Sequence, residues 1–184
     1  MIRKLSHRVA LALALTTLAL IGMASSAHAE ERRPVGSAFN INKSPSQRRE
    51  IDSIRKAGFP ALGMDYEVLA PGTSTYNCIA WSLGDTHDWI WPGTAVKSFD
   101  QLNAKHGFQK MAKLDFRVQP GVEKIVLYGK VVNGRTVATH QARQMADGTW
   151  TSKLGKMAVI RHATPNSLDG PDYGKPVAVY SRKK

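Results

Sequence analysis

The last third of the chain alternates between apolar and polar residues, and this pattern constrains the fold more than any other feature. The strand-like runs EKIVLYGKVV and TVATHQARQM flank Asn133-Gly134, a dipeptide typical of two-residue hairpin turns. A second turn signal, Asp147-Gly148, precedes the run TWTSKL, and two further strands are expected in MAVIRH and KPVAVYSR. Consecutive strands joined by short turns pair antiparallel, so the sequence predicts a β-meander.

The region before this meander has mostly helical patterns. Pro45 follows a possible N-cap, Ser44, and begins a helix that runs to Ala57. Further helices are predicted in CIAWSL at residues 78–83 and from Ser98 to His106, with a short strand at 66–69. Helices followed by an antiparallel sheet predict an α+β fold.

The first 29 residues have the pattern of a secretory signal peptide. A positively charged start, MIRKLSHRVA, leads into the apolar run LALALTTLALIGMA and then the cleavage motif Ala27-His28-Ala29. We therefore expect export to the periplasm or the extracellular space. After the signal peptide, residues 30–62 are predicted as a flexible segment with one helix, and residues 63–184 as a single domain.

The chain is strongly basic. Its formal net charge is +12, and removal of Arg3, Lys4 and Arg8 with the signal peptide leaves +9. Such a charge suits anionic envelope polymers, whereas no basic stripe interleaved with aromatic residues indicates a nucleic-acid partner. No other segment is apolar enough to span a membrane, and we expect a monomer.

Cys78 is the only cysteine of the chain and opens the predicted helix CIAWSL. Thr75 or Asn77 can cap that helix, and Gly84 can end it. Unpaired backbone N–H groups and the helix dipole favour a thiolate at a helix start, which is the nucleophilic form. A lone cysteine in an exported protein is therefore a candidate nucleophile, the alternative being a small buried apolar residue.

His140 is the predicted base, because it lies in the middle of the second strand of the meander. An imidazole that faces a thiol at a helix start forms a nucleophile–base pair, with the sulfur and a ring nitrogen within about 4 Å. Backbone N–H groups of the helix start, helped by Tyr76 or Asn77, would stabilise an oxyanion. His162 is the rival base.

The group that orients the imidazole stays open. A two-residue turn at Asp147-Gly148 would place Thr151 and Lys153 on the face of His140. Ser152 shares that face only if the register shifts by one residue, and a backbone carbonyl is a further possibility.

Aromatic residues surround the cysteine in the sequence. Trp89 and Trp91 flank Ile90 in the loop DTHDWIWPG, and with Trp81 and Lys153 they are the predicted lining of a cleft. The alternative for these tryptophans is ordinary packing of a loop on the core. The spacing of Asp85, His87 and Asp88 does not match a metal site, and no metal or cofactor is expected.

Several motifs resemble an uncharacterised family of bacterial domains over roughly residues 66–182. They are YNCIAWSLG, GVEKIVLYG, THQARQMADGTWTSKLG, IRH and DGPDYG. More distantly, the layout is similar to NlpC-type papain-like cysteine peptidases and amidases of the cell wall. This resemblance implies a papain-like fold, with Cys78 as nucleophile and His140 as base.

Two functions follow as hypotheses. The first is a secreted Cys-His hydrolase that cleaves amide bonds in peptides or peptidoglycan stems. The alternative is a non-catalytic binding module of the cell envelope on the same scaffold, with SKLG at residues 152–155 and the aromatic loop as recognition surface. The position of His140 relative to the Cys78 helix discriminates between them, because a pair that is not formed favours the binding module.

Overall fold

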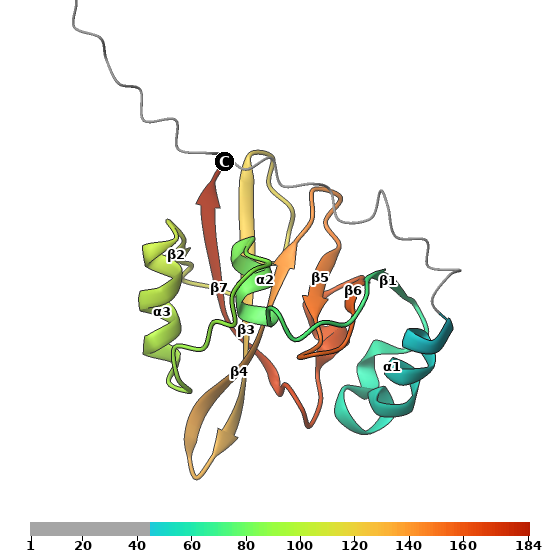
Figure 1. The fold of residues 1–184 in the computed structure, drawn as a ribbon. Helices are drawn as coiled ribbons and strands as arrows, with labels where there is room; N and C mark the ends of the chain where they lie inside the picture. The colour runs from blue at the N-terminus through green and yellow to red at the C-terminus, as the bar shows by residue number, and fades with distance from the viewer. Residues whose placement is uncertain (1–44) are drawn as a thin grey trace, which may run out of the picture. The chain divides into compact units, whose positions relative to one another are not determined.

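The computed structural model describes residues 45–184, which form one antiparallel sheet with three α-helices and two short 3-10 helices (Figure 1). The predicted signal peptide and residues 30–44 lie outside the described residues. The helical elements are α1 (Pro45–Gly58), η2 (Pro60–Leu62), α2 (Cys78–Leu83), α3 (Val96–Lys105) and η3 (Pro165–Leu168). The strands are β1 (Tyr66–Ala70), β2 (Gln109–Lys110), β3 (Val122–Val132), β4 (Arg135–Gln144), β5 (Trp150–Lys153), β6 (Val159–His162) and β7 (Lys175–Lys183).

The predicted meander is present. Its four strands β3 to β6 pair in sequence within a seven-stranded sheet of order β1-β6-β5-β4-β3-β7-β2. The last strand, β7, returns to pair with β3, and β1 adds to the edge next to β6. The α+β prediction is therefore confirmed, in a form that is mostly sheet. Among the described residues, no helix is long and apolar enough to cross a membrane.

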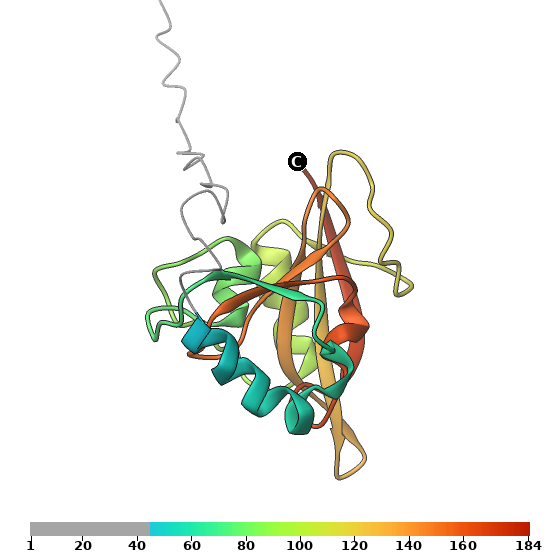
Figure 2. The same cartoon turned by 90° about the vertical axis from the view of Figure 1, so that its right-hand side faces the viewer.

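Each face of the sheet packs against a different set of helices (Figure 2). The α1-side core contains Ile51, Phe59, Tyr66, Val126, Tyr128, Ala142, Trp150, Ile160 and Val179. The α2-side core contains Cys78, Ile79, Leu83, Phe99, Ile125, Leu127, Ala138, Ala178 and Tyr180. Neighbouring residues of one strand, such as Val126 and Leu127, fall into different cores because successive side chains point to opposite faces. Since Ile51 of α1 joins the first core, α1 packs as part of the same unit as the sheet.

The two hairpin turns of the meander differ from each other. Asn133 and Gly134 both have positive φ and join Val132 to Arg135 as a two-residue turn, as predicted. The turn at Asp147-Gly148 instead has three residues, since the backbone N–H of Met145 donates to the carbonyl of Thr149. Trp150 consequently pairs with Gln144, one residue out of the predicted register. Thr151 and Lys153 therefore do not share the face of His140, whereas Ser152 does.

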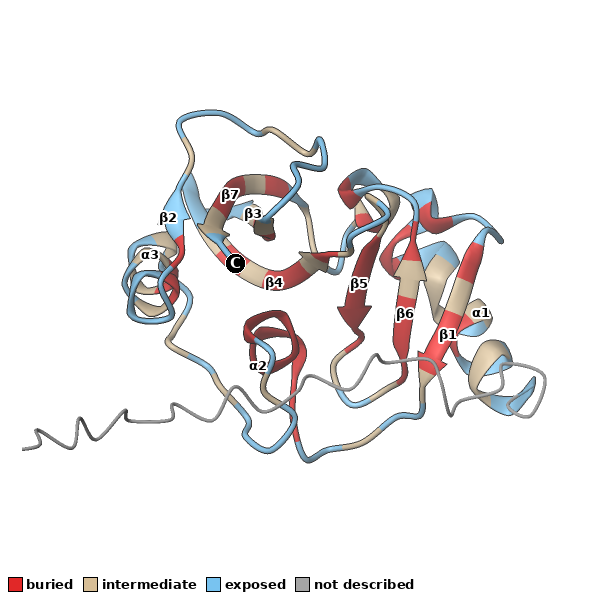
Figure 3. Ribbon diagram, turned by 90° about the horizontal axis from the view of Figure 1, so that it is seen from above, coloured by how far each residue is buried: buried red, intermediate tan, exposed pale blue. Residues whose placement is uncertain are grey.

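A bulge in β4 decides which way His140 points. His140 pairs with Tyr128, but Ala138 pairs with Gly129, so Thr139 is the extra residue. His140 consequently lies on the α1 side with Tyr128, and Ala138 lies on the α2 side. Figure 3 shows buried residues along the meander strands and throughout α2.

Candidate functional site

Cys78 is the first residue of α2, as the sequence predicts. Asn77 is the N-cap, and its Oδ1 accepts a hydrogen bond from the backbone N–H of Ala80 at 3.1 Å. Gly84 ends the helix in a left-handed conformation with φ of 87°. The helix has six residues, all of them buried, so the start of α2 is packed against protein.

Burial has a larger effect than the helix start on the protonation state of the Cys78 thiol. Cys78 is 6% exposed and lies among apolar residues of the α2-side core. This burial raises the pKa of the Cys78 thiol to about 11, although the backbone N–H of Gln141 offsets part of the rise. At neutral pH the group is therefore a neutral thiol.

His140 is completely buried on the other face of the sheet. Its ring stacks on Tyr173 with centroids 4.1 Å apart and lies 5.3 Å from the ring of Tyr128. Within residues 45–184, neither ring nitrogen of His140 has a hydrogen-bond partner. Burial, and then the proximity of His162, lower the pKa of His140 to about 3, so the imidazole is neutral.

The structure does not bring Cys78 and His140 together as the predicted nucleophile–base pair. Gln141, the next residue of β4, is the one that faces α2, and its Oε1 accepts a hydrogen bond from Ser82 at 2.9 Å. Because side chains alternate along a strand, His140 points away from α2. No hydrogen bond joins the Cys78 sulfur to either ring nitrogen of His140.

Ser152, a candidate orienting group, contacts the rival base instead. Its Oγ lies 3.0 Å from Nε2 of His162, and Nδ1 of His162 lies 2.8 Å from the carbonyl oxygen of Thr164. The carbonyl only accepts, so Nδ1 donates to it and Nε2 accepts from the Ser152 hydroxyl. His162 is buried on the α1 side, and its pKa is lowered to about 4 by burial. Both ring nitrogens of His162 are therefore engaged by Ser152 and Thr164, and not by the Cys78 thiol.

Three other predicted site residues are buried on the α2 side. Lys153 donates to the carbonyl oxygens of Thr73, Gly155 and Met157 at 2.9, 2.7 and 2.6 Å, and burial lowers its pKa to about 8. Trp81 donates from Nε1 to Thr151 Oγ1 at 3.1 Å and stacks on Tyr76. These side chains hold loops and core together, so they do not line a cleft that is open to solvent.

Two surface hollows lie elsewhere. One, of about 370 Å³, is lined by residues 118–123, 143–146 and Lys184. A second, of about 310 Å³, is lined by residues 65–67, 149 and 161–163. Neither includes Cys78, His140, Trp89 or Trp91.

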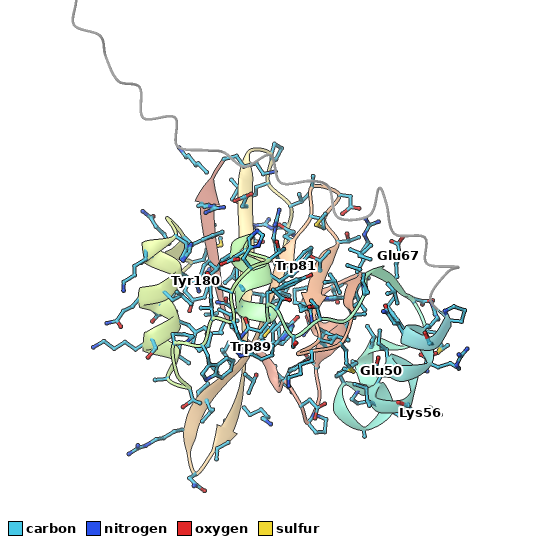
Figure 4. All side chains as sticks on the ribbon, viewed as in Figure 1. Glu50, Lys56, Glu67, Trp81, Trp89 and Tyr180 are labelled. Atoms are coloured by element: carbon cyan, nitrogen blue, oxygen red, sulfur yellow. The ribbon has the colours of Figure 1, made fainter. Side chains whose placement is uncertain are left out.

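The aromatic loop is the predicted feature that does reach the surface. Asn77 Nδ2 donates to the carbonyl oxygen of Ile90 at 2.6 Å, and the Ile90 side chain packs against the α2-side core. The neighbouring residues, Trp89 and Trp91, are 48% and 46% exposed. Trp91 also contacts Phe99 edge-on, with centroids 5.9 Å apart. In Figure 4, Trp89 lies below α2, toward the β3–β4 hairpin, and Trp81 lies against the sheet.

Asp85 Oδ1 accepts from the backbone N–H groups of His87 and Asp88, so it closes a turn. Among residues 45–184, no group of three His, Cys, Asp or Glu side chains is placed to hold a metal. The tip of the β3–β4 hairpin, absent from the predicted site, exposes 75% of Val131. The sequence feature that indicates this exposed tip is the pair of valines, Val131 and Val132, next to the Asn133-Gly134 turn.

A family described as Domain of unknown function (DUF7689) matches residues 67–181. The chain belongs to this family. The match covers most of the range predicted for an uncharacterised family. The DUF7689 region runs from β1 into β7 and so contains Cys78, His140 and the aromatic loop, while α1 precedes it. No curated protein and no solved structure gives a significant match.

The burial of Cys78 in the DUF7689 region predicts slow alkylation. With a pKa of about 11 against a usual value of 9.0, the thiolate is about 100-fold scarcer at neutral pH than in a free cysteine. Iodoacetamide labelling, followed by mass spectrometry over a pH series, should therefore accelerate only in strongly alkaline solution. Replacing His140→Gln should leave the neutral-pH rate unchanged. Rapid labelling at neutral pH that this substitution slows would contradict the separation of the two groups.

Proposed function

We propose that this DUF7689 protein is a non-catalytic binding module of the cell envelope. The observation that carries the proposal is the aromatic loop, which exposes Trp89 and Trp91 while Ile90 and Asn77 anchor it to α2. A rigid pair of exposed indoles offers large contact area at low entropic cost, a property of binding surfaces. The predicted signal peptide, and the net charge of +9 that remains after its removal from the +12 of the whole chain, support an anionic envelope component as the partner.

The hydrolase hypothesis has weaker support. A papain-like, NlpC-type site needs the thiol and the imidazole on one side of the sheet, within reach of a substrate. In this protein Cys78 belongs to the α2-side core, and His140 stacks between aromatic rings on the α1 side. Catalysis by this pair would require repacking of both cores, so binding is the function that we propose.

Sedimentation with isolated cell envelopes tests the proposal. The protein should sediment with envelopes, and the double substitution Trp89→Ala and Trp91→Ala should weaken binding by at least about 30-fold, the effect of losing a central aromatic contact. Leu114→Ala is the matched control, because Leu114 is exposed to a similar degree outside the loop. Unchanged sedimentation of the double variant, or none by the unmodified protein, would count against the proposal.

A further inference from the structure

Three segments meet around the β3–β4 hairpin and form one surface, which we call the hairpin surface: residues 89–97, 129–138 and 174–177. Ala95 forms a bridge with Val137, and the backbone N–H of Ala138 donates to the carbonyl of Thr94 at 2.8 Å. On the other side, Gly129 of β3 pairs with Lys175 of β7. Both side views show the hairpin projecting beyond the other described elements (Figures 1 and 2).

The hairpin surface carries apolar side chains that the other described elements leave exposed or half-exposed. Val131 and Val132 precede the turn, point to opposite sides of the hairpin as neighbours in β3, and are 75% and 45% exposed. Trp89 and Trp91 contribute two half-exposed indoles from the neighbouring loop. Residues 131–136, which include the Asn133-Gly134 turn, are all exposed, so the two valines lie at the projecting tip of the hairpin.

The charge of this surface has a single sign. Its three segments contain Lys97, Lys130, Arg135 and Lys175, and no acidic residue. Lys130 donates to the carbonyl oxygen of Pro171 at 2.9 Å, which holds its ammonium beside the hairpin. The flanking acidic residues lie just beyond the segments and are Asp88, Asp100 and Asp172. Of these, Asp100 is engaged by Lys110 and by the hydroxyl of Tyr180.

We propose that the hairpin surface binds the surface of an anionic lipid bilayer. Val131 and Val132 enter the headgroup boundary, Trp89 and Trp91 lie at the interface, and the four basic side chains contact headgroup phosphates. Tryptophan and cationic residues favour this interface, and aliphatic residues gain free energy only from a partner that removes them from water. The inference rests on the proposed function and names its envelope component.

Vesicle flotation tests the inference, with the protein purified in the processed form that the producing cell yields. Vesicles containing phosphatidylglycerol should bind the protein, and vesicles of phosphatidylcholine alone should bind it far less. Each basic residue near an anionic surface contributes about a fivefold factor, so Lys97→Gln with Arg135→Gln should weaken binding about 25-fold. High salt should weaken binding as well. Equal binding to both vesicle types would overturn the inference.

Matched variants separate this surface from general charge. Arg49→Gln with Lys56→Gln removes the same charge from exposed residues of α1 and should change binding less than about twofold. Val131→Thr with Val132→Thr keeps side-chain shape and β propensity, so it should fold normally and weaken binding by about tenfold. Equal losses from the α1 and hairpin charge variants, or no loss from the threonine variant, would contradict the inference.

Lipid-free sacculi distinguish this inference from the proposed function. Binding to anionic vesicles that the hairpin variants weaken supports both. Trp89-dependent sedimentation with sacculi, without binding to vesicles, leaves the envelope module standing and overturns the lipid surface as its partner. Absence of binding to vesicles, sacculi and whole envelopes overturns both.

Discussion

Acidification from about pH 7 to about pH 4 is expected to cost this protein on the order of 5 kcal/mol of unfolding free energy. The cause is the pair of buried histidines, whose pKa values fall from 6.5 to about 3 for His140 and to about 4 for His162. A histidine whose pKa is lowered in the fold is held neutral there, while the unfolded chain takes up a proton. Its contribution is complete above pH 6.5 and is lost as the pH falls toward the folded pKa.

Denaturant unfolding at a series of pH values measures this effect. His140→Gln removes one titrating group from the α1-side core and should flatten the pH dependence by roughly half. Leu114→Ala, an exposed substitution that removes no titrating group, is the control and should leave the dependence unchanged. The carboxyl groups of Asp115 and Asp147, whose pKa values are lowered by hydrogen bonds, add their losses only below the usual value of 3.8. An unfolding free energy that stays constant from about pH 7 to about pH 4 would contradict the conclusion that both histidines are buried in the neutral form.

The second large effect is expected from Trp150→Ala, at about 4 kcal/mol of lost stability. Trp150 is 1% exposed, pairs with Gln144 and His162, and contacts Phe116 edge-on at 6.1 Å. Its removal leaves a cavity in the α1-side core, and the loss of stability grows with the volume that the neighbours do not fill. Chemical denaturation should show this loss, whereas Trp89→Ala at the surface should cost less than about 1 kcal/mol. Similar losses for the two variants would contradict the burial pattern described for β5.

The pattern of the sequence predicts the elements well, because alternation and turn residues act locally. Asn133-Gly134 determines its hairpin through the positive φ that both residues adopt. Asp147-Gly148 carries the same kind of signal but closes a three-residue loop, with Gly148 at φ of 88°. The one additional residue in this loop shifts the register of β5, and so changes which side of the sheet Ser152 and Lys153 face.

The prediction of the site is sensitive to a register shift of one residue in the same way. His140 and Gln141 are neighbours with similar polarity, so the pattern of β4 does not reveal which of them faces α2. The bulge at Thr139 and the packing of Tyr173 on the His140 ring depend on residues distant in the sequence. The helix start at Cys78 was predictable from its cap, whereas the burial that raises its pKa comes from the whole α2-side core.

The central claim, binding without catalysis, is tested most directly by following new amine ends in envelopes that carry bound protein. We expect the unmodified protein and a Cys78→Ser variant to give the same release of amine ends as envelopes alone. Sedimentation in the same samples establishes that the protein is bound while release is measured. Release of amine ends that rises with time in the presence of the unmodified protein, and that Cys78→Ser abolishes, would contradict binding without catalysis.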